Sequence, residues 1–177
     1  MRQLSTATTD QLQQIIDVFM PVQWPASPDI VPELFQQLGW KQDTEEWGKT
    51  TLPVASQDTS FLIDNQFSEI PGGEFVEAYF DVSDGLTVEE RNDPAAKKQL
   101  QTAFKILLEQ MRLIIGPEQG SAKGWDYWWD MPSGGRIHLE RLSSAVEMYI
   151  RSKRYADTER LEADLKARGR WEYDEEE

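Results

Sequence analysis

Two pairs of aspartates are the residues of this chain whose types could hold a metal ion or perform acid–base chemistry. Asp126 and Asp130 share one face of a predicted strand, where the rise per residue places them about 13 Å apart. That separation is too long for a shared metal ion. Asp81 and Asp84 begin like a calcium loop, but the later ligands and the bidentate glutamate are missing. We therefore expect no metal site.

His138 is the only histidine, and the chain has no cysteine. A lone histidine without cysteine cannot build a common structural zinc site, and no GxSxG nucleophile elbow accompanies it. Glycine-rich phosphate loops of the GxGxxG and GxxxxGK[ST] types are also absent. We interpret His138 as a paired or solvated strand residue, which shares a face with Arg136 and Glu140. The sequence thus predicts no catalytic activity and no cofactor.

Aromatic and acidic residues alternate on two predicted strands. On the strand expected at 74–82, one face carries Val76, Ala78, Phe80 and Val82, and the other carries Phe75, Glu77, Tyr79 and Asp81. On the strand expected at 125–131, Trp128 lies between Asp126 and Asp130, opposite a core face of Trp125, Tyr127 and Trp129. Aromatic anchors among carboxylates suit a partner rich in Lys and Arg. The alternative is a half-solvated face that alternates for packing reasons alone.

Nearly all of the net charge of −14 belongs to the first half of the chain. Residues 1–90 contain 16 of the 32 acidic residues but only three of the 18 Lys and Arg residues. This asymmetry favours a basic protein partner over nucleic acid. The predicted binding acids are Glu45, Glu46, Asp58, Asp64, Glu77, Asp81 and Asp84, and the predicted anchors are Phe75, Tyr79 and Trp128.

The composition indicates a folded domain, because a disordered acidic chain would be poor in aromatic residues, which are 11% here. The N-terminus is interrupted by Asp10 and Asp17, so we expect no signal peptide, and no apolar run is long enough to span a membrane. The absence of cysteine fits a reducing cytosol. We expect a soluble cytoplasmic protein with one domain over residues 1–170 and a flexible acidic tail over 171–177. Its oligomeric state stays open.

Capping residues and apolar periodicity predict the elements that position these residues. Helices are expected at 9–20, from Pro28 to Leu38, at 94–115 and at 156–168. Alternation of period two predicts strands at 41–47, 49–55, 60–66, 74–82, 125–131, 136–142 and 145–151. This order predicts an α+β fold with a mainly antiparallel sheet, two N-terminal helices, a long central helix packed on the sheet and a C-terminal helix.

Four segments carry a resemblance to a known group of proteins: LFQQLGW at 34–40, LIIGPE at 113–118, GGRIHL at 134–139 and AVEMYI at 145–150. In this order they resemble bacterial proteins grouped with the immunity proteins of polymorphic toxins, over about residues 34–155. The resemblance implies an antidote that inhibits a toxin. It assigns no functional residue, because immunity contacts differ with each cognate toxin.

The leading hypothesis is therefore an acidic binding protein that neutralises a basic protein partner, such as a nuclease toxin, after fast electrostatically steered association. Mimicry of nucleic acid by the acidic half is a variant of this hypothesis. The alternative is a secretion chaperone or adaptor for an exported effector, which would present a long exposed apolar groove. An enzyme would instead show a deep pocket with carboxylates of raised pKa.

Overall fold

The computed structural model describes residues 2–40, 51–52, 57–64, 70 and 72–169. Most of the two strands predicted between residues 41 and 55 therefore lies outside the described residues, as do Glu45, Glu46 and the acidic tail. Asp58 and Asp64 lie on a described strand, but their side chains are outside what the structure describes.

The described strands form one antiparallel sheet with the order β1-β2-β3-β7-β6-β5-β4. Their bounds are β1 Thr51–Leu52, β2 Gln57–Asp64, β3 Glu74–Asp81, β4 Gly120–Ala122, β5 Asp126–Asp130, β6 Arg136–Arg141 and β7 Val146–Arg151. The predicted α+β fold is confirmed. Strand β4 was missed because three residues, Gly-Ser-Ala, are too few to show an alternating pattern.

Helices begin and end where local sequence signals place them. The bounds are α1 Thr9–Phe19, the short 3-10 helix η1 Pro28–Ile30, α2 Val31–Leu38, a second 3-10 helix η2 Glu90–Asn92, α3 Pro94–Ile115 and α4 Lys153–Ala167. Thr8 and Gln11 form a capping box at the start of α1, and Gly39 ends α2 in the left-handed conformation at φ 68°. Helix α4 begins three residues earlier than predicted, because Ser152 caps it.

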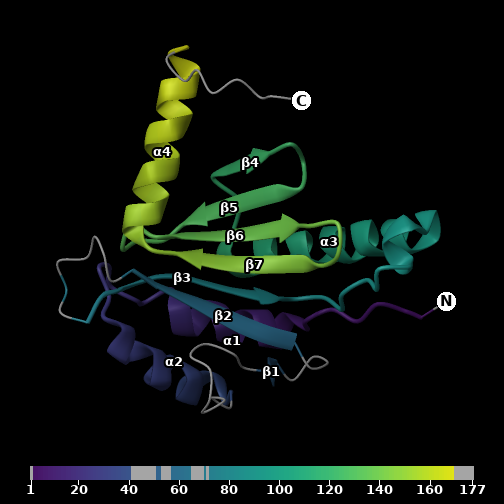
Figure 1. The fold of residues 1–177 in the computed structure, drawn as a ribbon, viewed down its shortest axis with the longest axis horizontal. Coiled ribbons are helices and arrows are strands. Elements are labelled where there is room, and N and C mark those ends of the chain that lie inside the picture. The colour runs from purple at the N-terminus through teal and green to yellow at the C-terminus, as the bar shows by residue number, and fades with distance from the viewer. Residues whose placement is uncertain (1, 41–50, 53–56, 65–69, 71, 170–177) are drawn as a thin grey trace.

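One face of the sheet carries the core. Figure 1 shows α3 behind β6 and β7 and α1 behind β2 and β3, so both helices cover the same face. The apolar stripes of the two helices are buried in one cluster with Ile137, Leu139, Met148 and Ile150 of the sheet. The long central helix thus packs on the sheet as predicted. Among the described residues, no helix is long and apolar enough to cross a membrane.

A β-bulge in β3 changes which residues face the core. Leu62 pairs with Glu77 and Ile63 pairs with Phe75, so Val76 has no partner on β2. Since an extra residue reverses the alternation beyond it, Phe75 turns to the core side. Phe75 is 0% exposed and packs on Trp24, with ring centroids 5.5 Å apart. The prediction that Phe75 is a surface anchor is therefore wrong.

Candidate functional site: the open face of the sheet

The sheet face opposite α1 and α3 is built from three rows of side chains that cross the strands β3, β7, β6 and β5 in register. We call them the acid row, Asp81, Glu147, Glu140 and Asp126; the aromatic row, Tyr79, Tyr149, His138 and Trp128; and the ion-pair row, Glu77, Arg151, Arg136 and Asp130. Within each row the side chains can contact one another, because cross-strand neighbours lie only about 5 Å apart at Cβ.

The acid row brings together four carboxylates from four neighbouring strands. Asp126 accepts a hydrogen bond from His138 at 2.9 Å, and Glu147 accepts one from the Tyr149 hydroxyl at 2.5 Å. Glu140 lies between Glu147 and Asp126. Burial and the charge of Asp126 raise the pKa of Glu140 above its ordinary value. This strip of the surface is therefore an electrostatic site for cations.

The aromatic row supplies half-buried rings beside the carboxylates. Tyr79 and Tyr149 stack with centroids 5.8 Å apart, and Trp128 lies 5.8 Å from the ring of His138. Gly120 lies opposite Trp128, and a Cβ there would come within 2.2 Å of the indole. The glycine thus gives the indole room to lie flat over β4. These rings are held in place, which lowers the entropy lost when an anchor binds a partner.

The ion-pair row binds helix α4 to the sheet. Arg136 and the ring of His138 contact the Glu159 carboxylate at 3.0 and 3.1 Å, and Arg151 also donates to it. Burial raises the pKa of Glu159, but His138 and Arg151 outweigh this effect and lower it to about 2. Burial lowers the pKa of His138, and its bonds to Asp126 and Glu159 overcompensate and raise it. Each ring nitrogen of the buried His138 faces a carboxylate, and the protonated ring, with two N–H donors, satisfies both.

Some of the predicted binding residues meet on this face. Tyr79, Asp81 and Trp128 are half-buried there and belong to the acid and aromatic rows. Glu77 is only 7% exposed and accepts from Arg151 at 2.7 Å, so it is a structural ion-pair partner.

Asp84 lies away from the three rows. It is 7% exposed, and its carboxylate accepts from the backbone N–H of Ser5 at 2.8 Å. The backbone N–H of Asp84 donates in turn to the Ser5 carbonyl, also at 2.8 Å. The prediction that Asp84 offers a free carboxylate to a partner is wrong, because this carboxylate fastens the N-terminal segment.

Glu140, Glu147 and Tyr149 of the open face are not among the predicted binding residues. The alternation of 136–142 and 145–151 already gives the correct face for each of them. Only the strand order shows that Glu147 lies between Asp81 and Glu140. The candidate surface therefore combines residues of the acidic half of the chain with residues of the balanced half.

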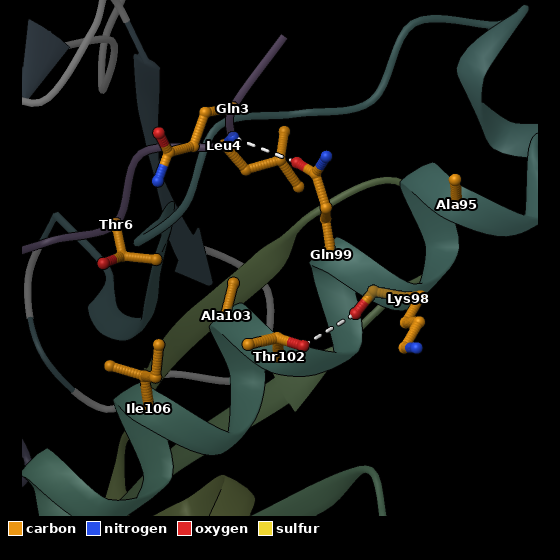
Figure 2. Close-up of a pocket in the computed structure, with 9 residues that line it drawn as sticks. All are labelled: Gln3, Leu4, Thr6, Ala95, Lys98, Gln99, Thr102, Ala103 and Ile106. Carbon is orange, nitrogen blue, oxygen red and sulfur yellow. Dashed lines mark hydrogen bonds between the residues drawn. The ribbon is translucent and has the colours of Figure 1, made fainter. Parts of the chain in front are cut away.

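The described residues also form a groove of about 740 Å³ between the N-terminal segment and α3. Figure 2 shows its lining, with Gln3, Leu4 and Thr6 on one side and α3 residues from Ala95 to Ile106 on the other. The backbone of Leu4 donates to Gln99 across it at 3.3 Å. Its lining contains one charged side chain, Lys98, and no carboxylate, so it offers no pair of acids for acid–base catalysis.

Metal ligation is not favoured by the geometry in the part of the chain that the structure describes. No group of three or more His, Asp or Glu side chains there could hold a metal ion. The open face offers carboxylates that can contact cations and rings that can contact apolar stems or cations.

Comparison with known proteins places the chain in a family. A search of the curated proteins found no match, and a search of the solved structures found none either. A family model matches residues 10–152, which include all three rows and end before α4. The chain therefore belongs to the family of unknown function DUF6301.

Proposed function

We propose that this protein binds a basic polypeptide through the acid row and the aromatic row, and acts by binding rather than by catalytic turnover. The observation that carries the proposal is the register that places Asp81, Glu147, Glu140 and Asp126 side by side. Like charges directly opposite each other destabilise a sheet. A partner that brings Lys or Arg side chains to this row removes that cost on binding.

The charge of the whole chain supports the same proposal. A net charge of −14 attracts a cationic partner over a long range and raises the association rate, most strongly at low ionic strength. The rings of Tyr79, Tyr149 and Trp128 then supply contact area close to the carboxylates. Rings of this kind govern the dissociation rate, since buried aromatic residues are the usual hot spots of interfaces.

The most specific form of the proposal is a cytoplasmic immunity protein that inhibits a toxin such as a nuclease. The support is chemical: a nucleic-acid-binding cleft is cationic, and a row of carboxylates can occupy it and block access. The resemblance of the four sequence segments to immunity proteins of polymorphic toxins supports the same function.

A second candidate function is a secretion chaperone or adaptor, and the groove of Figure 2 favours it. On the same helix, Ile106, which lines the groove, is 48% exposed, and Leu113, about two turns further along, is 83% exposed. An apolar segment of an effector would bind there. Ile106→Asp abolishes effector binding if this surface is used and leaves binding by the acid row intact.

Parallel capture experiments test the leading proposal. The tagged full-length protein, an acid-row variant Glu140→Lys/Glu147→Lys and a control Asp17→Lys/Glu33→Lys are used as baits in cell extract. The control residues are exposed on α1 and α2, and both variants change the net charge equally. We expect one basic protein with the wild type and the control, and its loss with the acid-row variant. Recovery of an acidic partner, or equal capture by all three baits, contradicts the proposal.

A further inference from the structure

Helix α4 is attached to the sheet by charged groups, with little apolar contact. Of its fifteen residues, all of which the structure describes, only Ala156 is buried, and Leu161 is 58% exposed. Arg160 contacts Asp130 at 2.8 Å, and Arg154 contacts Glu74 at 3.6 Å. Figure 1 shows α4 at the end of β7, extending beyond the edge of the sheet. A helix held in this way is poorly stabilised by the hydrophobic effect.

Three cationic side chains of the sheet converge on one carboxylate of this helix. Arg136 and His138 contact the Oε2 atom of Glu159 at 3.0 and 3.1 Å, and Arg151 donates to its Oε1 atom. Both carboxylate oxygens are therefore bound, in the manner of a ligand in a receptor site. Ordinary helix–sheet packing needs no such arrangement.

Each of the three cations is held in place by a second acid on the sheet. Asp130 contacts Arg136 at 2.9 Å, Asp126 contacts the ring of His138 at 2.9 Å, and Glu77 contacts Arg151 at 2.7 Å. The side chains of Arg136 and His138 are 9% and 4% exposed. Because these supports belong to the sheet, the cations keep their positions when Glu159 leaves. The site is preorganised for a carboxylate.

The site has an opening to the surface. A cavity of about 340 Å³ lies beside Glu159, and its lining includes Glu77, Arg151 and Tyr155. Arg151 can thus be reached from the cavity while α4 stays docked. In addition, the family match ends at Ser152, so the three cations lie inside the matched region and Glu159 lies outside it.

We propose that Arg136, His138 and Arg151 form a carboxylate-binding site, in which Glu159 of α4 is a built-in ligand that a carboxylate of another molecule can displace. This site contacts the acid row only through Asp126, which supports His138, and the inference does not depend on the proposed function. Helix α4 acts as a latch over the site, and binding of an external carboxylate releases it.

The single histidine makes the site directly observable, since its ring protons report the occupancy of the site by NMR. Acetate is titrated into full-length Glu159→Ala protein at constant ionic strength and at about pH 6, where histidine is protonated. We expect the His138 resonances to shift and to saturate with acetate. In the wild type, Glu159 competes with acetate for the site. At the same acetate concentration, the His138 resonances of the wild type should therefore shift at least tenfold less.

Glu162→Ala is the matched control, because Glu162 lies one turn further along α4, lines the same cavity and carries the same charge. It should behave like the wild type. Should the alanine variant fail to fold, Glu159→Gln keeps the shape of the side chain and one acceptor oxygen, and its His138 resonances should respond to acetate more weakly than those of Glu159→Ala but more strongly than the wild type.

Two further probes identify the source of the carboxylate. A peptide with the sequence of Lys153–Ala167 is compared with the same peptide carrying Gln in place of Glu159. If the His138 resonances shift and saturate with acetate but with neither peptide, the ligand is a small free carboxylate. If they shift with the peptide that contains Glu159 but not with the peptide that contains Gln, the ligand is a carboxylate side chain of a protein. Absence of a saturable shift in both Glu159 variants, equal shifts in all proteins, or a response to inorganic phosphate in place of acetate overturns the inference.

Discussion

Glu140 on β6 and Glu147 on β7 lie directly opposite each other on the open face of the sheet. On β5, Asp126 lies opposite Glu140, and on β3, Asp81 lies opposite Glu147. Sheets usually place opposite charges or uncharged pairs in such positions, and here Arg151 and His138 offset part of the repulsion that acts on Glu140. In the proposed function, a basic partner that binds this surface relieves the remaining cost.

Neutralising one member of the pair should therefore stabilise the free protein. For Glu140→Gln we expect a gain of about 0.5 kcal/mol in the free energy of unfolding at neutral pH, from urea denaturation. Burial and Asp126 raise the pKa of Glu140, so its charge penalises the folded state above that pKa. The gain should vanish in acid, where Glu140 is protonated in both states. Glu33→Gln, on the exposed side of α2, should change stability little, and a loss of stability in Glu140→Gln would contradict the account.

The charge state of His138 gives a second prediction. Although burial opposes it, the bonds to Asp126 and Glu159 raise the pKa of His138. Its NMR titration midpoint should therefore lie above the usual value of about 6.5, and Glu159→Gln should lower it. Because the folded-state pKa is raised, this histidine stabilises the fold below pH of about 6.5, and that stabilisation is lost as the pH rises through the folded-state pKa. A midpoint below the usual value would show that burial dominates.

Substitutions of Phe75 and Tyr79, which lie on the same strand, should reduce the free energy of unfolding by different amounts, because one ring lies in the core and the other on the surface. Phe75→Ala removes a fully buried ring that packs on Trp24, so we expect a loss of about 3–5 kcal/mol in the free energy of unfolding. Tyr79→Ala removes a half-buried ring stacked on Tyr149 and should cost clearly less, about 1 kcal/mol. Equal losses measured by chemical denaturation would argue against the bulge at Val76.

Tyr149 should act as an anchor for the captured partner. In Tyr149→Ala we expect dissociation to become faster by an amount that corresponds to about 2 kcal/mol, with a small change in the association rate. Surface plasmon resonance with the purified partner measures both rates. Leu161→Ala, an exposed apolar side chain on α4, serves as the control and should leave both unchanged. An unaltered dissociation rate in Tyr149→Ala would remove the aromatic row from the interface.

The sequence predicts the elements of this fold well where local signals are strong. Helix α3 runs from the capping Asp93 to the residue before Gly116, as expected from the order Asp-Pro at one end and Gly-Pro at the other. Alternation likewise assigns Arg136, His138 and Glu140 to one face. These features depend on interactions between residues that are close in the sequence, such as helix caps and the alternation of side chains along a strand.

The composition of the candidate site depends on contacts that are distant in sequence. The bulge that turns Phe75 inward arises from the pairing of β3 with β2, and alternation alone gives the opposite side. Glu147 joins the acid row because β7 lies between β3 and β6, an order that no local pattern encodes. Charge counted along the chain therefore favours residues 1–90, whereas the rows gather acids from both halves.

The association rate of the purified partner tests the central claim most directly. It is measured at low salt for the wild type, for Glu140→Lys/Glu147→Lys and for Asp17→Lys/Glu33→Lys. Because both variants change the net charge equally, any difference between them reports the position of the charge. We expect the acid-row variant to associate at least tenfold more slowly than the control variant, with the difference reduced at high salt. Equal rates for the two variants would show that the acid row is not the binding surface.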